Sequence, residues 1–131
     1  MPRGYQKTST TIYLMNYHFV WSPRYRRKLL VGKVAKRLEH LIYEKAKQLE
    51  CRVIQLGIMP DHVHLFIESN PRISPNRVIG EMKGYTSRVL RHEFPELLRM
   101  PTLWTRSYFA STAENVSSKI IEEYIEAQKG A

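Results

Sequence analysis

The chain has 131 residues, the length of one compact domain that can bury a core without help from a metal or a disulfide. Its apolar fraction of 43% and aromatic fraction of 11% exclude an intrinsically disordered chain. Lysine and arginine together number 21 against 12 acidic residues, and the resulting net charge of +9 favours a polyanionic partner, most often nucleic acid. A membrane surface is the less favoured polyanion, because the sequence has no long apolar run and no strongly basic amphipathic helix.

The single cysteine, Cys51, excludes an internal disulfide and a cysteine-based zinc site, and we interpret it as a small strand residue. The first residues carry no hydrophobic signal region, so we expect a cytoplasmic protein.

The first half of the chain predicts a strand, a helix and a hairpin. Residues 1–9 are polar and are expected to be loose, whereas β-branched and aromatic side chains over 10–21 predict a strand. Ser22-Pro23 ends it and a basic loop follows. Apolar residues spaced three and four apart predict a helix over 33–50. Residues 52–58 and 62–68 are expected to be antiparallel strands, because only Met59-Pro60-Asp61 separates them.

In the second half, Ser74 is the predicted N-cap of a helix that starts at Pro75 and runs to about His92. Residues 106–111 predict a short fourth strand, and a last helix is expected over about 115–128.

The first six of these elements follow the order of the ferredoxin-like, or RRM-like, βαββαβ fold. We therefore predict an α+β sandwich in a single domain, residues 1–131, with an antiparallel sheet and an additional C-terminal helix. In this arrangement the first and third strands are central and both main helices cover one face of the sheet. The other face stays open for function.

His62 and His64 are the most informative residues of the chain. Side chains alternate along a strand, so both imidazoles face one way, while Val63 and Leu65 face the other way into the core. Their Cα atoms are expected about 6.6–6.8 Å apart, which is close enough for both rings to bind one divalent ion. A His-x-His pair alone is a weak signal, because two ligands leave a metal under-coordinated.

The predicted last helix offers further ligands. Tyr124 and Gln128 are four residues apart and so share a helix face. The amide oxygen of Gln128 suits Mg²⁺ or Mn²⁺, and two imidazoles with one amide oxygen leave coordination positions open for phosphate oxygens and water. A tyrosine beside such an ion is a plausible nucleophile. Taken singly, each residue would be interpreted as an ordinary helix residue.

Several basic residues are candidates for contact with a nucleic-acid backbone. With Tyr25 interleaved and the net charge high, we favour phosphate contact over a merely solvated loop. The basic loop provides four of the predicted DNA-binding residues and the second helix provides two more: Arg24, Arg26, Arg27, Lys28, Lys83 and Arg88.

Other polar residues have two readings. His18 could neighbour the histidine pair across the sheet or simply be packed in its strand. Asp61 could orient a histidine, but shaping the turn after Pro60 is the reading we favour. We expect Glu68 to lie at the surface and Trp104 to pack in the core.

Taken together, these motifs resemble one family. Asp61-His62-Val63-His64-Leu65-Phe66 resembles the histidine–hydrophobic–histidine motif of the HUH superfamily, and Tyr124 to Gln128 resembles the Tyr-x-x-x-Gln of its single-tyrosine transposases. Further similar segments are Tyr17–Trp21, Arg24–Lys28, Met82–Arg88 and Leu103–Phe109. The resemblance is to transposases of the insertion sequence 200/605 family and covers nearly the whole chain in order.

This resemblance implies a DNA transposase that cleaves and rejoins single-stranded DNA at hairpin-marked ends of an insertion sequence. It implies that Tyr124 is the nucleophile, forming a 5′-phosphotyrosine and a free 3′-hydroxyl, and that His62, His64 and Gln128 bind Mg²⁺ or Mn²⁺. It also implies an obligate homodimer, in which the tyrosine helix can complete the partner subunit's site.

Two alternatives remain open at this point. One is a domesticated tyrosine nuclease that acts on chromosomal repeats with the same residues. The other is a non-catalytic single-strand nucleic-acid binder, but such binders place aromatic residues on the open sheet face, where this chain places two histidines.

Overall fold

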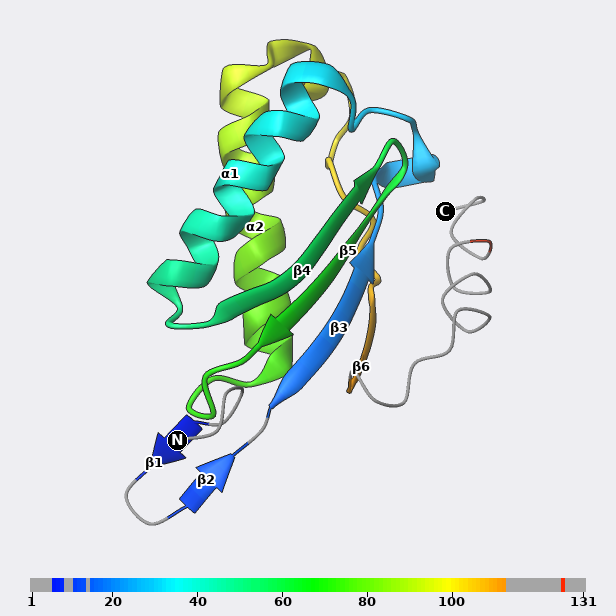
Figure 1. Ribbon diagram of the computed structural model, residues 1–131. Coiled ribbons are helices and arrows are strands. Elements are labelled where there is room, and N and C mark those ends of the chain that lie inside the picture. The colour runs from blue at the N-terminus through cyan, green and yellow to red at the C-terminus, as the bar shows by residue number, and fades with distance from the viewer. Residues whose placement is uncertain (1–5, 9–10, 14, 113–125, 127–131) are drawn as a thin grey trace.

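The protein is described by a computed structural model, which covers residues 6–8, 11–13, 15–112 and 126. Its main sheet has four antiparallel strands, β3 (Asn16–Trp21), β4 (Arg52–Met59), β5 (His62–Glu68) and β6 (Phe109–Thr112), in the order β4-β5-β3-β6 (Figure 1). The predicted ferredoxin-like topology is therefore confirmed, with β3 and β5 at the centre.

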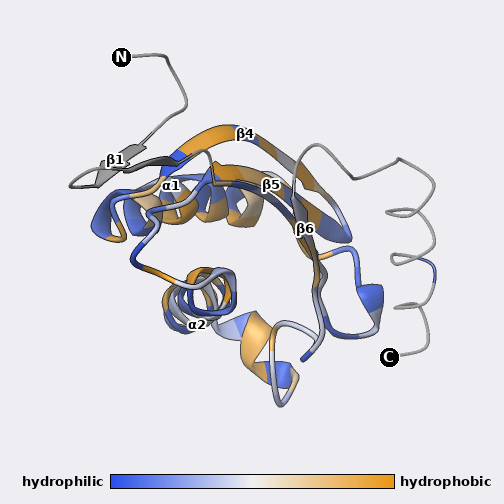
Figure 2. Ribbon diagram, turned by 90° about the horizontal axis from the view of Figure 1, so that it is seen from below, coloured by the Kyte–Doolittle hydropathy of each residue, from blue (hydrophilic) through white to orange (hydrophobic). Residues whose placement is uncertain are grey.

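Two long helices, α1 (Gly32–Gln48) and α2 (Pro75–Glu93), cover the same face of this sheet (Figure 2). Val63, Leu65 and Ile67 of β5 have no exposed surface and meet the apolar sides of both helices. Each such side chain contributes about 1.5–3 kcal/mol through burial. The register of β5 is fixed by this contact, because a slip of one residue would turn the apolar set outward. The histidines must then occupy the opposite face.

Helix α2 begins as predicted. Ser74 has extended backbone angles, its hydroxyl accepts a hydrogen bond from the Arg77 amide at 3.1 Å, and Pro75 occupies the first helical position. The cap satisfies one of the amides that a helix start leaves without a partner. No helix in the described part of the chain is long and apolar enough to cross a membrane.

The N-terminal prediction was only partly right. The strand expected over 10–21 is two strands, β2 (Thr11–Tyr13) and β3, and β2 pairs with β1 (Gln6–Thr8) in a separate two-stranded sheet. Residues 6–8 were expected to be loose, but pairing with β2 gives their backbone amides and carbonyls hydrogen-bonding partners, which polarity alone does not predict.

The last strand starts later than expected, at Phe109 instead of Arg106. The Lys83 ammonium donates hydrogen bonds to the carbonyls of Thr105, Arg106 and Ser107 at 2.6–3.2 Å. These three carbonyls thus bond to a side chain of α2 just before the residues that pair with β3. The helix predicted over 115–128 lies outside the described residues except for Glu126, which is helical.

Candidate active site

His62 and His64 lie on the sheet face opposite the helices, as the strand alternation predicts. Both side chains are half-buried, and their ring centroids are 4.8 Å apart with the planes nearly perpendicular. His62 is the first residue of β5, directly after the tight turn that joins it to β4. The pair therefore sits at one end of the sheet, where a bulky substrate can approach.

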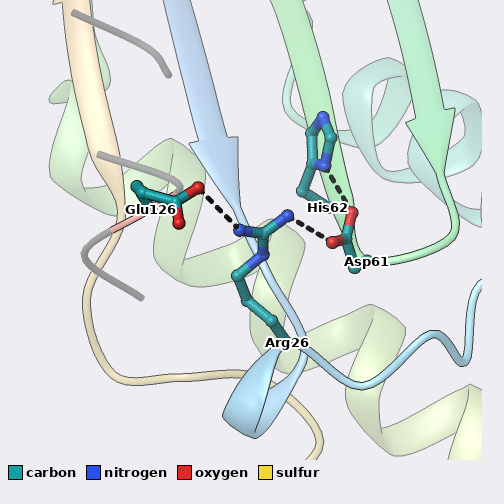
Figure 3. Close-up of polar contacts among 4 residues, drawn as sticks. All are labelled: Arg26, Asp61, His62 and Glu126. Atoms are coloured by element: carbon teal, nitrogen blue, oxygen red, sulfur yellow. Dashed lines mark hydrogen bonds and ion pairs between the residues drawn. The ribbon is translucent and has the colours of Figure 1, made fainter. Parts of the chain in front are cut away.

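The ring of His62 is oriented by the carboxylate of Asp61. Its Nδ1 lies 2.8 Å from Oδ1 of Asp61, and the other oxygen of Asp61 accepts from the guanidinium of Arg26 (Figure 3). The second terminal nitrogen of Arg26 lies 3.9 Å from Glu126. Asp61 thus orients a histidine, which was the less favoured of its two readings.

The charge of Asp61 is secured by these neighbours. Burial raises its pKa, but the hydrogen bonds from His62 and Arg26 and the charge of the guanidinium outweigh burial, so the pKa of Asp61 is lowered. An ionised Asp61 accepts the Nδ1 proton of His62, so in the neutral ring the lone pair lies on Nε2.

His64 has a different partner, His18 on the neighbouring strand β3. Nε2 of His18 lies 3.2 Å from Nδ1 of His64, and the His18 ring stacks on Phe66 with centroids 4.4 Å apart. Burial, with smaller contributions from the charges of His62 and His18, lowers the pKa of His64 to about 4, and burial also lowers the pKa of His18. Both rings are neutral at pH 7, the state in which an imidazole binds a metal.

This donor set fits a divalent ion in part. The Nδ1 atom of each of the two histidines has a partner, and when each donates its proton both Nε2 atoms are left as ligands. In the described ranges no three His, Cys, Asp or Glu side chains converge as a metal site would require. A further ligand must come from elsewhere, and the amide of Gln128 is of the predicted type.

A pocket of about 240 Å³ opens beside His64 on the same face of the sheet. Its walls come from the three strands β3, β4 and β5: His18, Gln55, Gly57, Met59, His64 and Phe66. Two further predicted site residues, Tyr124 and Gln128, lie outside the described residues, so their assigned roles stay predictions.

The basic residues divide into two groups. Arg27, Lys28 and Arg88 are exposed, and Arg24 is half-buried with its guanidinium near the Tyr25 ring. The charges of Arg26 and Lys83 are engaged inside the protein, with the Asp61 carboxylate and with three backbone carbonyls respectively. Burial lowers the pKa of Lys83 to about 8.

The sequence-based expectations of burial were wrong for Glu68 and right for Trp104. Glu68 was expected at the surface but is only 6% exposed, because Arg52 on β4 faces it with nitrogen–oxygen distances of 3.5 Å. Trp104 is buried as predicted and its indole donates to the hydroxyl of Thr86 at 3.1 Å. The sequence did not predict the contact of Arg26 with Asp61. The one sequence feature that could have indicated it is the position of Asp61 directly before the histidine pair.

Comparison with known families identifies the class of protein to which this fold and this site belong. Residues 11–128 match the family of IS200-like transposases. The chain is a member of that family.

Individual relatives agree with this assignment. The chain is 32% identical to the ISDra2 transposase TnpA of Deinococcus radiodurans, over 98% of this chain and 94% of the relative. It is 28% identical to the IS200 transposase of Salmonella typhimurium, over 86% of this chain and 75% of the relative.

Solved structures support the fold. A crystal structure of a Deinococcus radiodurans protein assigned as a transposase superposes with a TM-score of 0.89 at 31% identity, covering 96% of this chain and 99% of that one. A REP-associated tyrosine transposase bound to a REP hairpin shares the fold with a TM-score of 0.58 at 14% identity, over 92% of this chain and 69% of that one.

Proposed function

We propose that this transposase cleaves and rejoins single-stranded DNA through a covalent bond to Tyr124. The observation that carries the proposal is the pair His62 and His64, held on the open face by contacts of their Nδ1 atoms with Asp61 and His18. When each Nδ1 donates its proton, both Nε2 atoms are available as ligands. A non-catalytic binder has no use for two imidazoles held in fixed orientations at this place. Membership of the family supports the same reading.

In the proposed reaction the phenolic oxygen of Tyr124 attacks a backbone phosphorus atom. The new bond links the tyrosine to the 5′-phosphate, the bond from phosphorus to the 3′-oxygen breaks, and that oxygen leaves as a free hydroxyl. Attack by a 3′-hydroxyl reverses the chemistry and joins strands without a nucleotide cofactor, because the phosphotyrosine conserves the bond energy.

His62, His64 and Gln128 would hold the divalent ion, Mg²⁺ or Mn²⁺. When bound, the ion supplies polarisation of the phosphodiester and stabilisation of charge on its oxygens. The role of His62 and His64 is to present unprotonated nitrogens at fixed positions, and the role of Asp61 and His18 is to keep the rings in that orientation.

The substrate we propose is single-stranded DNA with a hairpin at the end of an insertion sequence. A REP-associated tyrosine transposase was solved with a hairpin, and the exposed Arg27, Lys28 and Arg88, with the half-buried Arg24, supply the positive charge that phosphates need. We also propose a homodimer whose subunits share sites, and light scattering of the purified protein tests it: a stable monomer would contradict this part.

A direct test uses labelled single-stranded DNA taken from both flanks of the gene, incubated with the protein and Mg²⁺. We expect an adduct that survives denaturing electrophoresis, and a free 3′-hydroxyl on the released strand. Tyr124→Phe should abolish the adduct while DNA binding persists. An adduct that persists in Tyr124→Phe, or wild-type protein that forms none with any end sequence, would refute the proposal.

A further inference from the structure

A chain of contacts joins the histidine strand to the C-terminal segment, and Arg26 is its centre. One terminal nitrogen of Arg26 contacts Asp61, which holds His62, and the other faces Glu126 at 3.9 Å (Figure 3). Arg26 and Asp61 are 35 residues apart, and Glu126 is 100 residues further along the chain from Arg26. Glu126 lies two positions from Tyr124 in the sequence.

The backbone around Arg26 is shaped for this contact. Tyr25 and Arg26 have φ of 60° and 50°, a left-handed conformation that residues other than glycine rarely adopt. Two such residues in succession persist only where surrounding contacts fix them, and such sites are often functional. The amide of Leu30 donates to the carbonyl of Pro60 at 3.0 Å and ties the basic loop to the turn that carries Asp61.

The burial of the side chains separates Arg26 from its basic neighbours. Its side chain is 12% exposed and that of Asp61 is 18% exposed, whereas Arg27 and Lys28 lie in solvent. A guanidinium has a flat fork of donors, so it can bind two carboxylates at different ends, which the single ammonium of a lysine does with less geometric control.

We propose that Arg26 is a positioning residue that couples the orientation of His62 to the placement of the C-terminal segment at Glu126. The inference rests on the proposed function, since it assigns a purpose to the coupling. One side chain contacts both the carboxylate that orients His62 and Glu126, which is two positions from the proposed nucleophile in the sequence. Arg26 itself touches neither DNA nor metal in this role, which replaces its predicted contact with phosphate.

The first arm of the test measures the metal without any reaction. Binding of Mn²⁺ is followed by electron paramagnetic resonance in Asp61→Ala, Arg26→Ala and Arg26→Lys. Loss of a group that orients a metal-binding histidine costs about 10- to 100-fold in affinity, so we expect Asp61→Ala in that range and both Arg26 variants to weaken binding as well. The matched control Arg99→Ala removes an exposed arginine on the same protein and should bind Mn²⁺ like the wild type.

The second arm addresses the C-terminal segment. Glu126→Gln removes a charge at an exposed position, so it should weaken Mn²⁺ binding by no more than about two- to fivefold, the range of an exposed ion pair, and lower the rate of adduct formation by a similar factor. Hydrogen exchange of the peptide containing Glu126 should accelerate in Glu126→Gln and in Arg26→Ala alike. The matched control Glu39→Gln, on the exposed side of α1, should alter neither quantity.

The combined variant gives the decisive result. If Arg26 acts through Glu126, Arg26→Ala with Glu126→Gln exchanges no faster than Arg26→Ala alone. Additive effects, or wild-type Mn²⁺ affinity in Arg26→Ala and Arg26→Lys, would overturn the inference. A wild type that binds Mn²⁺ but forms no adduct would refute the strand-transfer proposal instead, and the exchange and Mn²⁺ results would still decide the role of Arg26.

Discussion

His64 is the residue at which the chemistry of the site is most constrained. It lies between two other imidazoles, with its ring centroid 4.8 Å from that of His62 and 5.3 Å from that of His18. A proton on any one ring repels a proton on the next, and partial burial removes the water that would stabilise either charge. The cluster therefore favours neutral rings at His64 and His18, and a neutral imidazole is the state that binds a cation.

This arrangement predicts a pH dependence of stability in the absence of divalent ions. The pKa of His64 is lowered to about 4 in the folded protein, while an unfolded histidine has a pKa of about 6.5, so the unfolded chain binds more protons between these values. The free energy of unfolding should then fall by on the order of 2 kcal/mol as the pH drops from 6.5 to 4.

Urea unfolding at a series of pH values measures this effect, with His64→Gln as the comparison. The variant lacks the ring that is protonated, so its stability should fall less over the same interval. Equal falls in the two proteins would show that His64 does not carry the effect.

At the scale of elements, β5 serves two purposes at once. Its odd residues Val63, Leu65 and Ile67 anchor the strand under α1 and α2, and its even residues His62 and His64 carry the chemistry. Anchoring the core-facing side chains fixes the positions of the two histidines, because the side chains on both faces of a strand are attached to the same backbone. Helix α2 contributes to that anchoring, so its start bears on the site.

The start of α2 gives a prediction of its own. Ser74→Ala removes the hydroxyl that accepts from the Arg77 amide and should lower the free energy of unfolding by about 1 kcal/mol. Ser74→Asp keeps an acceptor at the cap and should retain most of the stability. Urea denaturation of the three proteins checks this, and an equal loss in both variants would contradict the capping role.

At the scale of the whole molecule, the basic side chains behind the net charge of +9 differ in whether they are available to bind DNA. Arg26 and Lys83 have their charges engaged within the protein, whereas Arg27 and Lys28 extend the basic loop into solvent near the histidine end of the sheet. Binding of single-stranded DNA should therefore depend on salt, because each phosphate neutralised by the protein releases counterions.

The two exposed residues of the basic loop allow the size of the salt dependence of DNA binding to be predicted. The double variant Arg27→Ala and Lys28→Ala should reduce the slope of log K against log salt concentration by about 1.4, at roughly 0.7 for each phosphate of a single strand that the protein no longer neutralises. A control of equal charge, Lys36→Ala with Lys47→Ala on the exposed side of α1, should change the slope much less. Fluorescence anisotropy measures both, and equal changes would assign the effect to net charge alone.

Local patterns were sufficient for much of the architecture. The spacing of apolar residues located α1 and α2 to within one or two residues, and Ser74-Pro75 marked the start of α2. Alternation in β5 put both histidines on one face. The predictions failed where a distant side chain decided the outcome: Lys83 delays the start of β6 by bonding the carbonyls before it, and Arg52 allows Glu68 to be buried.

By itself the sequence determined the fold class, the shared face of His62 and His64, and the family, since each depends on the order and spacing of neighbouring residues. Only the tertiary structure decided which partners hold those histidines. His18 lies 46 positions from His64, and Arg26 lies 35 positions from Asp61. Such pairs are set by strand register and by the approach of a loop to a turn, and these arise only when separate elements pack around one core.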